Sequence, residues 1–398
     1  MRQVSSELPS TAAGFAGFFF LLSGISVLRP VRDQAGIAQR VAALPRMFGA
    51  TFFAVLAGAL LVAWLATRVP RSRYIPLTYR AFGAGLVVAC IALHAGAPWA
   101  HASLFVWSSA WSLLAVSLFW GLLTDVFGQA ARRFGVIAAG GTAGTLAGPL
   151  LVQWLARPLG PANLLLISAA LLELAVRSAA VLRRNPAGGS PAAPSRFRVR
   201  DALASLLRSN LLRPLCGYVL LFTGTATLLY VEQARIVAAS SNDARERTLL
   251  FARVDLAVNA TTLALQTCIA RPFLQRAGLR AALSVLPLLT AAGFVALARA
   301  PSLAVLAATQ GLRKAAHFGV ERPGREALLT ALERDQKYAP KALVDGVVYR
   351  GGDALAAWLS QALPAAALFP AALALCGLWL VNALWLARGG EARRGNAQ

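Results

Sequence analysis

Apolar runs of about 20 residues recur along this chain, separated by short polar segments rich in arginine and proline. A helix of about 20 apolar residues spans the hydrocarbon core of a bilayer. The pattern therefore predicts transmembrane helices rather than the buried core of a soluble protein. The twelve predicted spans are residues 12–30, 47–67, 76–96, 101–123, 136–156, 161–182, 211–231, 251–270, 281–299, 301–319, 343–363 and 364–387.

The composition agrees with an all-α membrane protein. Hydrophobic residues make up 58% of the 398 positions and charged residues 14%, whereas a soluble domain has roughly 45–50% and about 25%. The net charge of +23 would indicate a nucleic-acid partner in a soluble protein. Here most arginines lie between apolar runs, as in the cytoplasmic loops of membrane proteins. The expected partners are therefore the lipid bilayer and a small solute, not a nucleic-acid polymer.

An even number of spans places both termini on one side of the membrane. Most of the 39 lysines and arginines fall on that side, so we expect both termini to be cytoplasmic. The first apolar run ends at Arg29-Pro30 without a small-residue cleavage pattern. We therefore interpret it as a retained first helix and not as a signal peptide.

The chain divides into two halves at its one long connection, residues 183–214. This segment begins with a linker rich in proline, glycine and serine, and ends in a basic stretch typical of an amphipathic surface helix. We expect an N-terminal six-helix bundle over residues 1–182, a cytoplasmic linker over 183–210 and a C-terminal six-helix bundle over 211–398.

The two halves resemble each other. Residues 21–38 align without gaps with 221–238, and residues 138–147 align with 349–358. Both matches fall on the first and fifth spans of their halves. Twelve spans arranged as a 6+6 pseudo-repeat are typical of transporters, and the arrangement here resembles the major facilitator superfamily.

The eleventh span contains charged residues, in the stretch LVDGVVYRGGDALAAWL. A charge in hydrocarbon costs about 2.5–3.5 kcal/mol on insertion scales, which favours a functional role. Arg350 and Asp353 are three residues apart and can pair on one helix face. With Tyr349 they are predicted to bind a phosphate and a stacked base; a structural ion pair is the alternative. Asn259, one turn after Asp255, is a further candidate for substrate binding.

Charged residues also gather at the predicted outer ends of the first and seventh spans. Arg29 and Arg32 are expected in the first outer loop, because Pro30 ends or bends the helix before them. They are candidates for a basic vestibule that receives an anion. An outer gate of ion pairs and simple solvated loop charges are the other interpretations. The residues predicted for gating or coupling are Asp33, Glu232, Arg235 and Asp255.

The fifth span carries small residues every four positions, which let helices approach closely. The pattern Gly135-x8-Gly144-x3-Gly148-Pro149 also resembles "motif C" of facilitator-superfamily exporters and antiporters, although Val152 replaces its closing glycine. The helix-packing candidates are a partly different set. The residues are Gly140, Gly144, Gly148 and Pro149.

Common catalytic and metal-binding patterns are missing from the sequence. The four cysteines are scattered without a CxxC pair, and the three histidines are isolated. GxxxxGK[ST], HExxH and GxSxG do not occur. We therefore expect no enzyme activity, no metal and no cofactor.

Four stretches together resemble the ATP/ADP translocase family, the nucleotide exchangers of plastids and intracellular bacteria, and its shorter proteobacterial relatives. They are VLRPVRDQAG, ARRFGVIAAGGTAGTLAGPLL, YVEQARIV and RPGREALLTALERDQKYAPKALVDGVVYRGGDALAAWL. The resemblance implies a facilitator-like fold in a bacterial inner membrane, no catalysis, and exchange of nucleotides or related phosphorylated anions. The lysines of this chain, Lys314, Lys337 and Lys341, are expected at or near the cytoplasmic face.

Two functions are consistent with the sequence. The first is a secondary transporter, an antiporter that exchanges an organic anion by alternating access, with a nucleotide as the leading candidate. The second is a proton-coupled exporter of drugs or metabolites, which the glycines of the fifth span favour. In that case Asp255, Glu232 or Asp353 is the protonation site. We expect the protein to function as a monomer.

Overall fold

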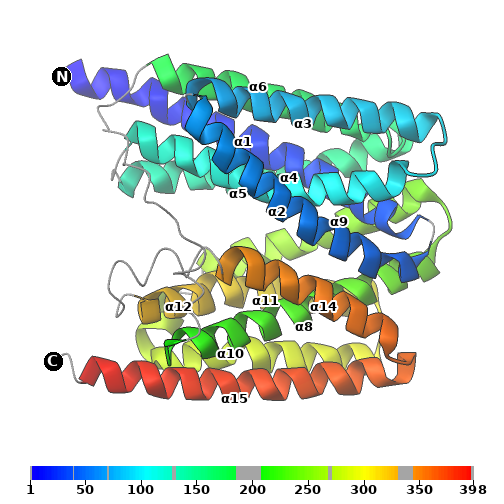
Figure 1. Ribbon diagram of the computed structural model, residues 1–398, viewed down its shortest axis with the longest axis vertical. Helices are drawn as coiled ribbons and strands as arrows, with labels where there is room; N and C mark the ends of the chain where they lie inside the picture. Colours follow the sequence, from blue (N-terminus) through cyan, green and yellow to red (C-terminus); the bar gives the residue numbers. More distant parts are fainter. Residues whose placement is uncertain are drawn as a thin grey trace. The chain divides into compact units, whose positions relative to one another are not determined.

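The computed structural model describes residues 2–38, 40–69, 71–127, 131–184, 208–267, 271–329 and 344–395, and all regular secondary structure in these ranges is helical (Figure 1). The α-helices are α1 Arg2–Ile37, α2 Leu44–Arg68, α3 Arg71–His94, α4 Ala100–Phe127, α5 Ala131–Leu159, α6 Leu164–Arg184, α8 Leu212–Ser240, α9 Ala244–Leu265, α10 Arg271–Arg299, α11 Leu303–Ala316, α12 Arg322–Leu329, α14 Tyr349–Ala362 and α15 Leu368–Gly395. The short helices η1 (Val41–Ala43) and η5 (Ala365–Ala367) precede α2 and α15.

The tenth and eleventh transmembrane helices each contain a π-helical turn. The turn η3, His317–Glu321, joins α11 to α12, and the turn η4, Val344–Val348, leads directly into α14. The other ten helices are long and apolar enough to cross a membrane without interruption. The structure thus confirms the predicted all-α fold with twelve helices.

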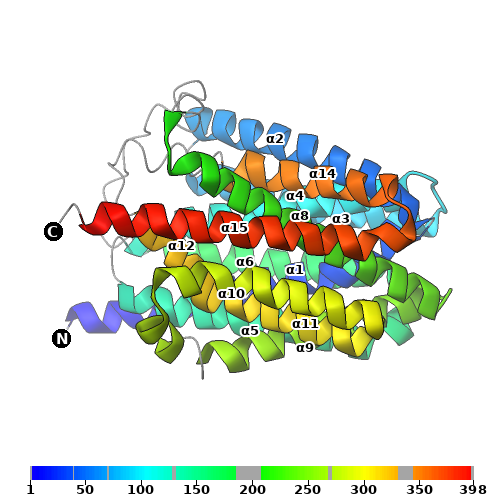
Figure 2. The same cartoon turned by 90° about the horizontal axis from the view of Figure 1, so that it is seen from below.

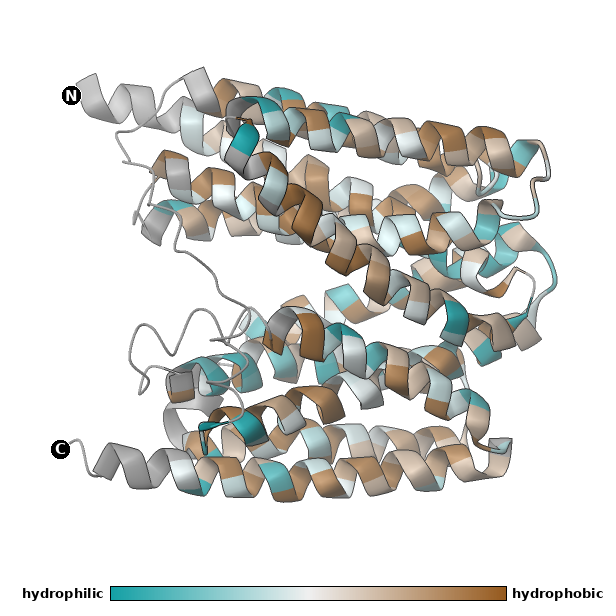
Figure 3. Cartoon of the chain, in the orientation of Figure 1, coloured by the Kyte–Doolittle hydropathy of each residue, from teal (hydrophilic) through white to brown (hydrophobic). Residues whose placement is uncertain are grey.

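Large apolar side chains cover the outside of the helices. Leu60, Trp154 and Val381 are 64%, 73% and 67% exposed, and hydrophobic positions run along most of α2 (Figure 3). Exposed apolar surface of this extent is unusual for a soluble monomer, and it suits contact with lipid.

Contacts between Cα atoms divide the chain into two compact units. Unit 1 comprises Met1–Ala43, Gly49–Ala193 and Ala238–Leu256, and unit 2 comprises Leu44–Phe48, Pro194–Val237 and Ala257–Gln398. Helix α9 therefore begins in unit 1 and ends in unit 2. Most of the predicted linker, 183–210, lies outside the described residues.

In unit 1, α1 packs mainly against α5 and α6. The glycines of α5 make this possible: a Cβ atom at Gly144 would collide with the carbonyl oxygen of Phe19, and one at Gly148 would lie 2.5 Å from the Cβ of Ser26. The backbones of α1 and α5 are thus in direct contact. On the other side of α1, the Ser168 hydroxyl of α6 donates a hydrogen bond to the Gly24 carbonyl at 2.9 Å.

Unit 2 repeats this contact between its first and fifth helices. A Cβ atom at Gly352 of α14 would collide with Thr223 of α8. Gly352 aligns with Gly141 of α5, where a Cβ would meet Phe18 and Leu22 of α1. The internal repeat in the sequence therefore corresponds to the same helix contact in both units. Elsewhere in unit 2, α10 lies against both α11 and α15 (Figure 2).

The first helix is longer than predicted. It does not end at Pro30 but continues to Ile37, so Arg29 and Arg32 lie on a helix and not in a loop. The residues after Pro30 include Val31 and Ala35, which are each 1% exposed. Their burial offsets the hydrogen bond that proline removes. In the same way α8 continues to Ser240, so Glu232 and Arg235 are also helical.

We expect Gly144→Ala to destabilise the protein, because its Cβ collides with the backbone of α1 and the backbone cannot move aside. Overpacking of this kind costs about 1–3 kcal/mol. The measurement is the midpoint of thermal unfolding in detergent. Gly135→Ala is the matched control, since Gly135 lies on the same helix with nothing within 4 Å of its Cβ position. Equal midpoints for the two variants would contradict the contact.

Candidate functional site

Helix α11 carries a buried guanidinium at the centre of unit 2. Arg313 is 9% exposed. Its Nε donates to the Thr290 hydroxyl of α10 at 3.1 Å, and its Nη2 donates to the Phe222 carbonyl and the Thr225 hydroxyl of α8 at 2.7 and 3.2 Å. Its Cζ also lies 5.0 Å from the centroid of the Phe222 ring. One side chain thus joins three helices.

All the hydrogen-bond partners of Arg313 are neutral. Among the residues that the structure describes, no carboxylate forms an ion pair with it. A guanidinium does not lose its proton in proteins, and the membrane interior compensates a charge poorly. The Glu321 carboxylate is within electrostatic range of Arg313, but its own ion pairs are with His317 and Arg325. An anionic ligand can therefore still pair with the Arg313 guanidinium.

Lys314 follows Arg313 on α11 and contacts α9. Its Nζ donates to the Asn259 side-chain oxygen of α9 at 2.6 Å. It lies about 16 Å along a helix that begins at Leu303 and continues to Leu329. The tenth helix therefore does not end at residue 319, and the position of Lys314 near the cytoplasmic face stays a prediction. Lys337 and Lys341 lie outside the described residues.

The predicted pair on the eleventh helix is in contact in the structure. Arg350 Nη1 lies 3.2 Å from Asp353 Oδ2, and the Thr227 hydroxyl of α8 donates to Asp353 Oδ1 at 2.9 Å. Asp353 is 7% exposed. The Nε of Arg350 is buried and has no hydrogen-bond partner among the described residues. This donor is a second position at which an anion can be bound.

A group of aromatic rings centred on Phe222 lies near both Arg313 of α11 and Arg350 of α14. The Phe222 ring of α8 stacks on the His317 ring at 4.6 Å and contacts the rings of Tyr349 and Trp379 at 6.1 and 5.9 Å. Tyr349 also lies under its neighbour Arg350, 5.7 Å from ring centroid to Cζ. Cations beside aromatic faces suit an anion that carries a planar group.

Most polar residues of the tenth helix were not predicted as site residues from the sequence. Gln310 donates to Gln233 of α8 at 2.9 Å, and Arg313 and His317 follow at helical spacing. Residues three and four positions apart share one face of a helix. That spacing is visible in TQGLRKAAHFGVE, so a count of polar residues at intervals of three and four would have found this face.

The residues predicted for gating lie near the C-terminal ends of α1 and α8 and in the middle of α9. Within unit 1, Arg32 pairs with its neighbour Asp33 at 2.6 Å, and Arg29 lies 4.0 Å from Asp255 of α9. Within unit 2, Glu232 pairs with Arg235 on the same helix at 3.7 Å. The contact between Arg29 and Asp255 therefore joins two helices, whereas the other two pairs each lie within one.

Further polar contacts join α9 to α5 within unit 1. Arg157 pairs with Glu246 at 3.3 Å, and the Gln153 amide donates to the Leu249 carbonyl at 3.1 Å. The first part of α9 is thus held by polar contacts from both α1 and α5.

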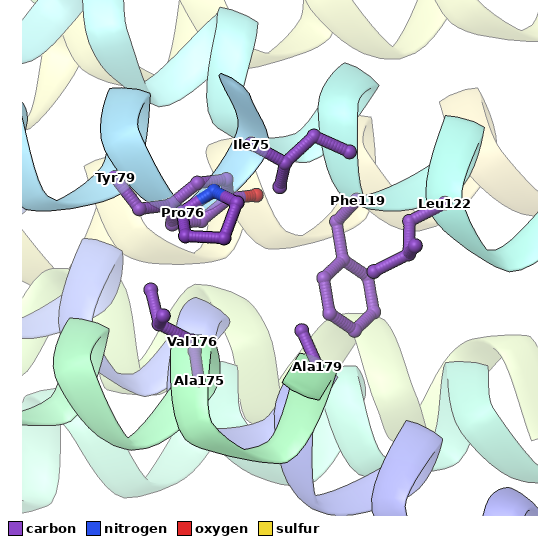
Figure 4. A pocket seen from close by; sticks show the side chains of 8 residues that line it. All are labelled: Ile75, Pro76, Tyr79, Phe119, Leu122, Ala175, Val176 and Ala179. Carbon is purple, nitrogen blue, oxygen red and sulfur yellow. The ribbon is translucent and has the colours of Figure 1, made fainter. Parts of the chain in front are cut away.

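A hollow of about 10 Å³ between α3, α4 and α6 is too small and too apolar for an organic anion (Figure 4). Its only polar side-chain atom, the Tyr79 hydroxyl, donates to the Ala115 carbonyl at 2.6 Å. The lining residues are Ile75, Pro76, Tyr79, Phe119, Leu122, Ala175, Val176 and Ala179.

Comparisons with known proteins show the fold. No family model matches the chain, and no curated protein matches it. A mutant of the nucleoside transporter NupG matches with a TM-score of 0.68 and 13% identity, covering 97% of this chain and 99% of that one. A POT family transporter in complex with 5-aminolevulinic acid matches with a TM-score of 0.70 and 10% identity, covering 96% of each chain.

A third solved structure, a mutant of the peptide transporter POT in complex with alafosfalin, has a TM-score of 0.67 and 14% identity, covering 95% of each chain. All three comparisons cover nearly the whole of both chains. The protein therefore has the twelve-helix major-facilitator fold of these transporters.

Removal of the Asp353 carboxylate is expected to destabilise unit 2, because it leaves the Arg350 charge unpaired within the helices. Breaking such a pair costs about 3 kcal/mol. Asp353→Ala should lower the unfolding midpoint in detergent more than Thr227→Val, which removes only one hydrogen bond. The double variant Asp353→Ala/Arg350→Met should recover much of the loss. If it is no more stable than Asp353→Ala, the two charges do not depend on each other.

Proposed function

We propose that the protein is a secondary transporter that exchanges organic anions across the membrane by alternating access. The observation that carries this proposal is Arg313, a buried guanidinium whose hydrogen-bond partners among the described residues are all neutral. A charge without a counterion inside a helix bundle is costly. It is explained if the counterion is the transported solute.

Exchange, rather than one-way transport, follows from the same charge. The empty carrier would have to change conformation with an uncompensated arginine, whereas the loaded carrier is neutralised by its anion. If the charge costs about 2.5–3.5 kcal/mol, the empty step is slowed about 100-fold. Return with a second anion is therefore faster than return without one.

The neighbouring side chains support an organic anion. Tyr349, Phe222 and His317 provide ring surface beside Arg313 and Arg350, which suits a nucleotide with its phosphate on the guanidinium groups. The resemblance to ATP/ADP translocases favours the same class. The similar solved structures include a nucleoside transporter and one with bound 5-aminolevulinic acid, so this fold accepts small organic solutes.

The polar contacts of α9 are proposed to act as the gate. Arg29–Asp255 and Arg157–Glu246 attach its first part to α1 and α5, while its second part carries Asn259 beside Lys314. One helix thus connects the gate to the binding residues. We further propose that the chain functions as a monomer in a bacterial inner membrane with both termini cytoplasmic, because its arginines are distributed in that sense.

The alternative, a proton-coupled exporter, is favoured by one observation: Asp353 and Glu232 are buried carboxylates at 7% and 8% exposure. Uptake that collapses with an uncoupler would support it. Exchange that persists with the uncoupler would support the anion antiporter.

Exchange is tested in proteoliposomes preloaded with ADP, by uptake of labelled ADP and other nucleotides. Arg313→Gln is expected to reduce exchange about 100-fold, since it removes the charge that holds the anion. Arg313→Lys should retain part of the activity. Arg177→Gln is the matched control, because Arg177 pairs with Glu173 on α6 and is 73% exposed. Normal exchange by a folded Arg313→Gln protein would refute the proposal.

A further inference from the structure

Three titratable side chains, His317, Glu321 and Arg325, form a connected series that begins one helical turn beyond Arg313. The proposed anion site does not use this series. His317 Nδ1 donates to Glu321 Oε2 at 2.7 Å. Arg325 Nε lies 3.3 Å from Glu321 Oε1. The three side chains are 16%, 2% and 13% exposed. The positions are four residues apart, and the π-helical turn His317–Glu321 lies at the start of the series.

One aromatic ring connects the His317–Glu321–Arg325 series to the anion site. The Phe222 ring stacks on His317 with a centroid distance of 4.6 Å and an angle of 17°. The guanidinium of Arg313 lies over the same ring at 5.0 Å. His317 and Arg313 therefore lie on one face of the tenth helix, against one side chain of α8.

Within the series, His317 is the side chain whose charge can change near neutral pH. Glu321 already faces Arg325, so these two charges cancel while His317 is neutral. The Nδ1 hydrogen of His317 is directed to Glu321, and this leaves its Nε2 lone pair to accept a proton. A neutral histidine adds no charge beside Arg313, and a protonated one adds a second positive charge.

The other groups near His317 do not change their charge near neutral pH in this way. Phe222 of α8 stacks on His317, and Tyr349 of α14 and Trp379 of α15 contact Phe222 in turn. On α14 the Asp353 carboxylate is paired with Arg350. Cys376 of α15 is within electrostatic range of Arg313, and the buried polar residues of α10, Ser284 and Thr290, are neutral. Histidine is the side chain whose charge ordinarily changes between pH 5 and 8.

We propose that His317 takes up a proton when an anion with two negative charges binds beside Arg313, so that the transporter carries one proton with each such anion. Arg313 alone balances one negative charge, and the imidazolium balances the second. The proton comes from water and is held at Nε2, with no other bond made or broken. This inference rests on the proposed anion transport.

The test is calorimetric binding to the full-length protein in detergent, with matched monoanions and dianions as probes. The pairs are cyclic AMP with AMP, methyl phenyl phosphate with phenyl phosphate, and monomethyl succinate with succinate. Binding heats in two buffers of different ionisation enthalpy, at about pH 7.5, count the protons taken up. The dianions are expected to take up about one proton each, and the monoanions none.

His317→Gln keeps a donor for Glu321 but cannot hold a proton. We expect it to bind monoanions as the unchanged protein does, to take up no proton with dianions, and to bind dianions at least about tenfold more weakly. His317→Lys should bind dianions without proton uptake, because its charge is already present. His101→Gln on α4 of unit 1 is the matched control and should behave as the unchanged protein.

The outcomes separate the two proposals. If no probe binds, or if Arg313→Gln binds all probes normally, the anion-transport proposal fails and the role of His317 falls with it. If anions bind through Arg313 but dianions take up no proton, the inference about His317 alone is wrong. The same holds if His317→Gln still takes up a proton.

Discussion

The architecture of unit 2 depends on one buried guanidinium. A charge that cannot be removed must be satisfied where it lies, and the structure satisfies Arg313 with acceptors from α8 and α10. These bonds fix the position of α11 against both helices. Because Gln310 and His317 share that face of α11, they too are brought against α8. The same interaction that positions the helix thus assembles the candidate site.

Close backbone contact provides the frame in which such a charge can be held. The first and fifth helices touch in both units, through Gly144 and Gly148 in unit 1 and through Gly352 in unit 2. Backbones this close leave no room for side chains between them, so neither helix can rotate without a collision. In unit 2 this fixes α14 against α8, and Asp353 then meets Thr227. Precise placement of this polar pair therefore follows from the missing side chain at Gly352, the residue next to Asp353.

Much of the fold could be predicted from the sequence, because a span in lipid needs a continuous run of apolar residues. The errors occur where polar residues lie inside a helix. The apolar pattern predicts that the first helix ends at Pro30, but Val31 and Ala35 continue its buried face. It predicts that the tenth helix ends at residue 319, but the helix passes through Glu321 to Leu329. Hydropathy cannot separate a polar loop from a polar face that neighbouring helices bury. Contacts such as Arg313 with Thr290 depend on tertiary packing and leave no local pattern.

The two π-helical turns occur on the helices that carry the buried charges. The turn His317–Glu321 begins one helical turn after Arg313, and the turn Val344–Val348 ends just before Tyr349 and Arg350. A π-helical turn rotates the side chains that follow it relative to an unbroken α-helix, and such turns are common at functional sites. Here one of them places Glu321 against His317. A regular α-helix is also the more stable backbone arrangement, so these turns are the points at which the two helices bend at least cost. A bend at either turn would move the charged side chains beside it, so the proposed anion transport and the π-helical turns concern the same residues.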